Sequence, residues 1–366
     1  MANIQIKKGR IFLYFCFEVA NEITLENIEK IFGKSPELSK LEYHRLTPRY
    51  IQYKSPPLFV KIENIEINKR KFEITAKMFE FGVITIKFST SFSGSLKSLQ
   101  EISYELTENK DIQKKAESSL KKVINEIKGT LINPREEFDW EDYCIFIVNK
   151  FDKKIDAKTL LAQNKKELAY ILRSDINLSD MEIHDSIKNP IMYTPNDVIL
   201  TDWNATFIYN TAFTYVPHLS YNILDVLEYA VIELLELRVY DDTLDKSLDM
   251  AYEDITKEKR IKLSLNPFGK TLNQLSQVKL DISSIIDKVE NALKLFGDLY
   301  LVKIYNAASS RFYLGNWKNS VREKLNTIQN TYSFLYEQTT NRRMVILEIM
   351  IVLLFILDII VYLRAG

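Results

Sequence analysis

The chain has 366 residues, enough for two domains of ordinary size and one further segment. Its 49 basic and 49 acidic residues balance, so no global field favours nucleic acid or an anionic surface. A hydrophobic content of 46% with only 9 Gly and 9 Pro excludes a largely disordered chain. The two cysteines, Cys16 and Cys144, lie far apart, which excludes a disulfide-rich scaffold and is typical of a reducing compartment.

The N-terminal apolar run at residues 11–17 follows basic residues and superficially resembles a signal peptide. It is short, it is followed at once by Glu18, and no small-residue cleavage site comes after it. We therefore interpret it as a buried strand, and we expect the bulk of the chain to face the cytoplasm.

The first half of the chain alternates between strand and helix periods. A strand at 11–17 is followed by a short amphipathic helix at 24–32. Three further strands are predicted at residues 58–65, 72–79 and 83–89. One long helix is expected from residue 95 to about residue 128, because apolar side chains recur on one helical face.

The same order recurs in the second half. A strand at 144–148 and a helix at 157–172 come first. Short strands are then predicted at residues 191–193, 198–202 and 205–209, and a long helix from residue 220 to about residue 255.

Two bends support this recurrence. The segment Phe79–Ile86 parallels the segment Thr201–Ile208, with an aromatic residue, then Gly82 or Asn204, then an apolar strand. Gly and Asn tolerate a left-handed backbone best. We predict an α+β fold with two tandem ferredoxin-like βαβββα modules, residues 1–130 and 131–260. The alternative is a chance similarity between two α/β halves.

A helical stalk is predicted at residues 261–343. One apolar stripe comprises Leu272, Leu275, Ile282, Ile286, Val289, Leu293 and Phe296. A second comprises Trp317, Val321, Leu325, Ile328, Tyr332 and Leu335, at coiled-coil spacing. We favour an intramolecular helical hairpin over an intermolecular coiled coil.

The segment 344–363 is predicted to be a transmembrane helix. It is 20 residues long, 18 of them apolar, and at about 1.5 Å per residue it spans roughly 30 Å. Insertion gains about 5–10 kcal/mol from the apolar residues against at most about 6 kcal/mol for Glu348 and Asp358. Arg342 and Arg343 before the span, against Arg364 after it, indicate a cytoplasmic body and a tail-anchored topology.

The two acids in this helix predict assembly. Intramembrane carboxylates usually face a partner helix or a cavity. Glu348 and Asp358 lie about 80° apart around the helix, so one broad face can present both to a second copy. We therefore expect a homo-oligomer, with snorkelling of the acids towards the headgroups as the alternative.

The densest polar cluster follows the apolar start of the 220–255 helix. It comprises Glu228, Glu233, Glu236, Arg238, Asp241, Asp242, Asp245, Asp249 and Glu253. Four of its acids recur every four residues and share a helical face, which could bind a divalent cation or a basic partner. The alternative, which we favour, is a solvated face over buried leucines.

The second candidate is Asp202-Trp203-Asn204, as an interaction site or as a strand bend with a core Trp. His44, His184 and His218 have no metal-ligand spacing, and no phosphate loop or catalytic motif occurs. We therefore predict no catalytic residues, no metal site and no cofactor.

Several of these segments resemble a known family. They are the run Val226–Asp245, the Asp202-Trp-Asn and Phe79-Glu-Phe-Gly segments, and the terminal pattern from Tyr300 through Trp317 to Ile349. Together they resemble the "required for meiotic nuclear division" family, domain of unknown function 155, in its prokaryotic branch. The resemblance implies membrane-tethered assembly into large oligomers and supplies no catalytic residues. Eukaryotic members are similar to mitochondrial proteins that support translation.

Three functions follow from these observations. The first is a tail-anchored, non-enzymatic scaffold or adaptor that recruits an unknown cytoplasmic protein partner to the membrane. The alternative is a ribosome- or RNA-associated tether, for which the basic turn Asn68-Lys69-Arg70-Lys71 is the place to look. A metal-dependent enzyme that uses the Asp241 and Asp245 stripe is the third.

Overall fold

The computed structural model describes residues 4–28, 57–214, 218–256, 276, 279–280 and 299–365. The chain divides into two units, which we take separately. The first comprises Met1–Leu237 and Ile285–Gly315, and the second Arg238–Ser284 and Asn316–Gly366. The expected apolar stripe from Leu272 to Phe296 lies outside the described residues, as do residues 29–32 of the helix expected at 24–32.

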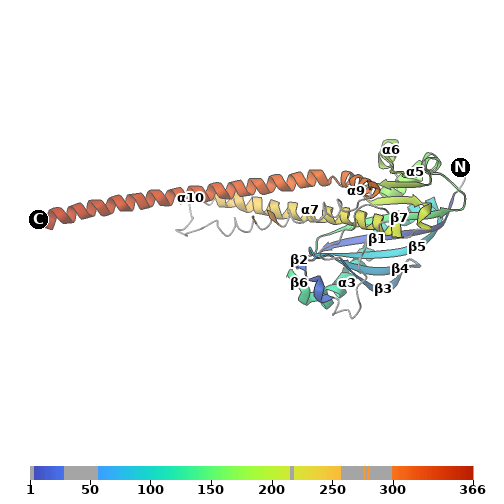
Figure 1. Ribbon diagram of the computed structural model, residues 1–366, viewed down its shortest axis with the longest axis horizontal. Helices are drawn as coiled ribbons and strands as arrows, with labels where there is room; N and C mark the ends of the chain where they lie inside the picture. Colours follow the sequence, from blue (N-terminus) through green and yellow to red (C-terminus); the bar gives the residue numbers. More distant parts are fainter. Residues whose placement is uncertain are drawn as a thin grey trace. The chain divides into compact units, whose positions relative to one another are not determined.

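Seven strands of the first unit form one mixed sheet (Figure 1). They are β1 (Gln5–Glu18), β3 (Leu58–Ile67), β4 (Arg70–Met78), β5 (Val83–Ser95), β7 (Trp140–Phe151), β8 (Asp197–Thr201) and β9 (Ala205–Asn210). Their order is β3-β4-β5-β1-β7-β9-β8. The central strand β1 is antiparallel to both β5 and β7 and is buried on both faces, which explains its continuous apolar run.

Two helices that the sequence predicts as continuous are each divided into two shorter helices. The helices of the first unit are α2 (Leu96–Glu108), α3 (Lys110–Ile127), α4 (Ala157–Gln163), α5 (Lys165–Arg173), α6 (Asp180–Ser186), the start of α7 (His218–Thr256) and α9 (Leu299–Arg311). The helix expected at 95–128 is interrupted at Asn109, whose side chain accepts hydrogen bonds from the backbone N–H groups of Asp111 and Ile112 at the start of α3. The helix expected at 157–172 is interrupted at Asn164. Asn competes for backbone hydrogen bonds and so favours a helix cap over a helix interior.

Smaller elements complete this unit. β2 (Ala20–Ile23) and β6 (Leu131–Pro134) pair in a two-stranded sheet, and single 3-10 turns occur at η1 (Leu25–Asn27), η2 (Lys128–Thr130) and η3 (Thr211–Thr214). The expected strand at 191–193 is reduced to one bridge between Ile191 and Ile199.

Helices cover both faces of the large sheet. Alternate side chains of β1, among them Leu13 and Phe15, belong to one core with residues of α2, α3 and α5. The opposite face packs against the first part of α7, where the Phe79 and Tyr229 rings lie 5.6 Å apart. It also packs against Phe312, directly after α9, whose ring lies 5.2 Å from that of Tyr143.

The tandem ferredoxin-like arrangement is not confirmed. Both halves contribute strands to one sheet, but β1 pairs with β5 antiparallel whereas β7 pairs with β9 in parallel. The two bends also differ. Gly82 has a φ of 92°, whereas Asn204 is not among the residues with positive φ, so the two bends do not share a left-handed backbone. At Asn204 the side-chain amide donates to the carbonyl of Arg173 and holds the turn instead.

The second unit contains the end of α7 and most of α10 (Leu314–Ala365). Val321, Leu325, Ile328 and Tyr332 are buried at the predicted stripe positions of α10. The Lys324 ammonium of α10 lies 2.8 Å from Asp241 and 2.6 Å from Asp245 of α7. Within this unit the two helices therefore pack on each other.

The last part of α10 is long and apolar enough to span a membrane. An 18-residue window of the 22-residue segment Arg343–Arg364 has a mean hydropathy of 3.0, and none of that window is buried. Glu348 and Asp358 lie in this segment, and both are exposed.

Candidate functional site

The turn between β8 and β9 contains the predicted residues Asp202, Trp203 and Asn204. Asp202 is buried and accepts a hydrogen bond from the backbone N–H of Trp203, 2.9 Å away. The alternative of a core Trp was wrong, because Trp203 is 43% exposed. Its indole packs instead against Phe312 and Tyr313, with ring centroids 6.1 and 6.4 Å away.

Ion pairs between Asp and Arg side chains connect this turn to α5, α6 and α9. The Arg173 Nε of α5 donates to the Asp202 carboxylate at 2.5 Å, and Arg173 also pairs with Asp185 of α6 at 3.3 Å. Arg311 of α9 lies 2.8 Å from Asp185 and 3.8 Å from Asp202. Its hydrogen bond holds the pKa of Asp185 below the usual range, whereas burial raises the pKa of Asp202. The network makes the turn a rigid platform.

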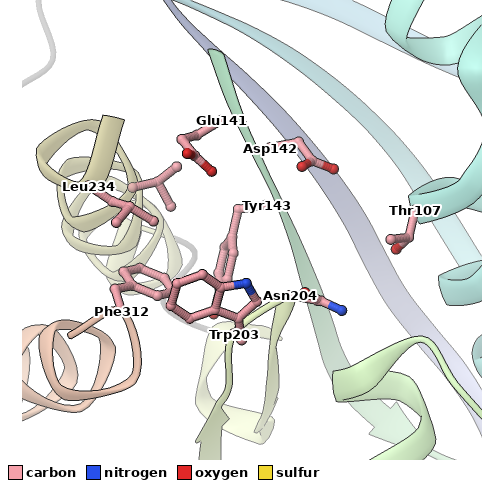
Figure 2. A pocket seen from close by; sticks show the side chains of 9 residues that line it. Thr107, Glu141, Asp142, Tyr143, Trp203, Asn204, Leu234 and Phe312 are labelled. Atoms are coloured by element: carbon pink, nitrogen blue, oxygen red, sulfur yellow. The ribbon is translucent and has the colours of Figure 1, made fainter. Parts of the chain in front are cut away.

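A small pocket opens beside this platform (Figure 2). β9 begins at Ala205, opposite Cys144, so residues 141–143 of β7 pair with β1 on one side and border the pocket on the other. The cavity has a volume of about 70 Å³. Its lining consists of Thr107, Glu141, Asp142, Tyr143, Trp203, Asn204, Val231, Leu234 and Phe312.

The lining combines carboxylates with aromatic rings. Burial raises the pKa of Asp142 to about 6, and within the described part of the chain no cation pairs with its carboxylate. The Tyr143 hydroxyl donates to the carbonyl of Asp202 at 2.9 Å and lies 2.9 Å from the Thr206 hydroxyl. Neither Lys nor Arg lines the pocket, so its electrostatic character is acidic.

The polar cluster on α7 divides near Arg238. Glu228, Glu233 and Glu236 are buried, so the favoured interpretation of a solvated face was wrong for these three. Glu228 pairs with Lys77 of β4 at 2.8 Å, and Glu233 accepts from the hydroxyl of Tyr305. Those partners lie 151 and 72 residues away, which is why the local sequence does not reveal them.

Beyond this point several charged side chains of the same helix are exposed. Arg238, Asp242, Asp245 and Asp249 are exposed, and Asp241 is half-buried. Lys324 pairs with both Asp241 and Asp245, and the Ser320 hydroxyl donates to Asp241 at 3.0 Å. Among the described residues no group of three or more His, Cys, Asp or Glu is arranged to hold a metal ion.

The basic turn at residues 68–71 joins β3 and β4 as a tight hairpin, in which Asn68 and Lys69 have positive φ. It is not a uniformly basic surface. Asn68 donates to Glu105, and Lys71 lies opposite Glu66 in the hairpin register. The structure thus adds no specific support for an RNA interface here.

Sequence reasoning missed the residues that complete the turn and the pocket. Arg173, Arg311 and Asp142 lie in three separate segments, and the only local signal is the run Trp140-Glu-Asp-Tyr143, with two acids at the start of an apolar strand. Cys16 and Cys144 are free and buried. Burial raises the pKa of both thiols, so neither is a reactive nucleophile.

Comparison with known proteins places the chain in a family. Residues 8–214 match the family described as the N-terminal domain of the uncharacterized protein MJ0711. The uncharacterized protein MJ0711 of Methanocaldococcus jannaschii is 26% identical over 221 residues, which is 60% of this chain. The chain spans 65% of the length of that relative. No solved structure matches the chain. Since the match covers more than half of its residues, this protein belongs to the MJ0711 N-terminal domain family.

Proposed function

We propose that this protein is a single-pass membrane protein whose folded body is a non-enzymatic scaffold or adaptor for a cytoplasmic protein partner. The observation that carries the proposal is the segment Arg343–Arg364 of α10. Its large apolar side chains are about half exposed or more, from Met350 at 47% to Tyr362 at 81%. Removing a side chain of this kind from water gains about 1.5–3 kcal/mol, so a bilayer stabilises the segment strongly.

The β8–β9 turn supports the adaptor role. Trp203 is 43% exposed and Tyr313 is 62% exposed, and the two rings lie against each other. The ion pairs of Asp202 with Arg173 and Arg311 hold the turn in place. Rigid aromatic side chains of this kind are the usual anchors of protein interfaces, because little conformational entropy is lost when they bind.

The resemblance to the "required for meiotic nuclear division" family supports the same proposal, since it implies membrane-tethered assembly. Glu348 and Asp358 support a homo-oligomer, because acids in a membrane-spanning helix usually face a partner helix or a cavity.

The membrane anchor is tested by carbonate extraction. The full chain should remain in the membrane pellet, and a chain without residues 344–366 should be released as soluble protein. If the truncated chain still sediments after the carbonate wash, the anchor assignment is wrong. Protease treatment of sealed vesicles then tests the orientation, with a cytoplasmic body cut only from the cytoplasmic side.

The adaptor role is tested by crosslinking in cells, followed by mass spectrometry. A photoreactive residue at Tyr313 should give a specific protein adduct that Trp203→Ala reduces. The matched control is Tyr104→Ala on α2, which removes an aromatic side chain that is 56% exposed and does not line the pocket. An adduct that is equally strong in wild type and Trp203→Ala would contradict the role of this turn.

A further inference from the structure

The chemistry of the pocket at the edge of β7 indicates what kind of ligand it binds, and this inference does not depend on the membrane anchor. Its walls come from five parts of the first unit: α2, β7, the β8–β9 turn, α7 and the residue after α9. Figure 2 shows Asp142 and Thr107 on one side of β7, and Glu141, Tyr143, Leu234 and Phe312 on the other, with Trp203 and Asn204 below Tyr143. The pocket therefore reaches both faces of the sheet at the edge of β7 that β9 leaves unpaired, and carboxylates and aromatic rings both line it.

The acidic lining of the pocket favours a positively charged ligand. Glu141 and Asp142 are the charged groups of the lining, and both are acids. The nearby guanidiniums of Arg173 and Arg311 already pair with Asp202 and Asp185. The Asp142 side chain, by contrast, is half-buried and has no ion-pair partner in the described part of the chain. A half-buried, uncompensated carboxylate favours a bound cation over an anion or a neutral molecule.

The volume of the pocket and its aromatic lining indicate which kind of cation fits. A volume of about 70 Å³ admits a group of a few heavy atoms and excludes a nucleotide. Aromatic faces attract organic cations, and the apolar surface of the Trp203 indole suits a short alkyl stem. No group of three or more metal-ligating side chains occurs among the described residues, so the lining does not resemble a metal centre.

We propose that this pocket binds the ammonium head of an alkylamine, with the charge on Asp142 and the alkyl stem against the Trp203 indole at the unpaired edge of β7. The same chemistry is presented by a free small amine and by the lysine side chain of a partner protein.

The test uses the detergent-purified full chain and butylammonium as the probe, followed by saturation-transfer NMR. We expect saturable binding with a dissociation constant of roughly 1–10 mM. The uncharged isostere butanol should bind at least about tenfold more weakly, because it lacks the charge-assisted contact. Failure of butylammonium to saturate up to about 100 mM would overturn the proposal.

Two variants and a control locate the site. Asp142→Asn keeps the shape of the side chain and should weaken butylammonium binding at least about tenfold. Trp203→Leu should weaken it roughly threefold or more, through loss of the aromatic face. Glu137→Gln removes an exposed acid on the same connection to β7, outside the pocket, and should leave binding unchanged. Near-UV circular dichroism verifies that each variant is folded, and equal binding by folded Asp142→Asn and wild type would refute the site.

Two further arms identify the ligand. Displacement of butylammonium by millimolar Mg²⁺ would refute the organic-cation assignment in favour of an inorganic ion. An acetyl-Gly-Lys-Gly-amide peptide, compared with its norleucine counterpart, separates the two sources of the ammonium group. Tighter binding of the lysine peptide than of butylammonium identifies a protein partner, and the reverse order identifies a free amine.

Because these measurements need neither a bilayer nor a partner, their failure would leave the anchor and adaptor proposals standing.

Discussion

Lys77 of β4 and Glu228 of α7 form an ion pair of 2.8 Å in which both side chains are only 4% exposed. Asp225 lies at the same distance from the Lys77 ammonium, and the rings of Phe59 and Phe79 lie 5.1 Å from it. One ammonium of the sheet therefore pairs with two carboxylates of the buried start of α7.

Replacing this ammonium should destabilise the first unit severely. Lys77→Met removes the cation that pairs with the buried Glu228, and we expect a loss of about 3–5 kcal/mol in the free energy of unfolding. Urea unfolding followed by circular dichroism measures the loss. Lys61→Met is the matched control, because the Lys61–Glu73 pair is 57% and 41% exposed and should contribute less than about 1 kcal/mol. Equal losses in the two variants would contradict a special role for the buried pair.

The turn of Asp202 should show energetic coupling to Arg173. Arg173→Met leaves the buried Asp202 carboxylate short of a cation and should cost about 2–4 kcal/mol. In an Asp202→Asn background the same change should cost less, with a coupling energy of about 1–3 kcal/mol. A thermal double-mutant cycle measures it. Strictly additive effects would show that the ion pair does not hold the turn.

Asp142 should destabilise the protein at neutral pH. Its pKa is raised from 3.8 to about 6 by burial, so between these two values the folded state binds the proton more tightly than the unfolded state. The stability contributed by this proton is present below pH 3.8 and is lost as the pH rises through 6. Asp142→Asn should therefore be more stable than wild type at pH 7.5, by about 1–2 kcal/mol, with the difference vanishing near pH 4. Melting temperatures at the two pH values measure the stability difference. A difference that grows towards pH 4 would contradict a raised pKa of Asp142 in the folded state.

Gly82 should not tolerate a side chain. Its φ is 92°, and a Cβ atom there would lie 1.8 Å from the backbone carbonyl oxygen of Ala20. Gly82→Ala should cost about 2–4 kcal/mol, from the left-handed backbone and the overlap together. Gly129→Ala is the control, because nothing lies within 4 Å of its added Cβ. Thermal unfolding compares them, and similar melting temperatures for the two variants would contradict the close approach at Gly82.

The homo-oligomer proposed for the membrane-spanning helix should depend on its acids. The detergent-purified wild type should have the mass of more than one copy, and Glu348→Leu/Asp358→Leu should lower that mass. Light scattering coupled to gel filtration measures it. A monomeric wild type would refute the oligomer. An unchanged mass in the double variant would place the interface in another part of the chain.

The sequence by itself determined the local features of this protein. The apolar run at 11–17 predicted the central strand, and the runs at 83–89 and 205–209 predicted β5 and β9. The segment 344–363 is apolar enough to span a bilayer whatever surrounds it, because its composition alone sets that property. Periodicity and hydropathy are local, and a single sequence displays them directly.

The tertiary structure decided which distant residues meet. Periodicity does not show that β7 and β9 pair in parallel while β1 and β5 pair antiparallel, nor that Lys77 reaches Glu228 across 151 residues. Charge patterning favoured a solvated acidic face on α7, but burial of a charge is decided by its partner and not by its neighbours in the chain. The pocket beside Asp142 exists because β9 begins opposite Cys144, and strand register is a property of the folded sheet.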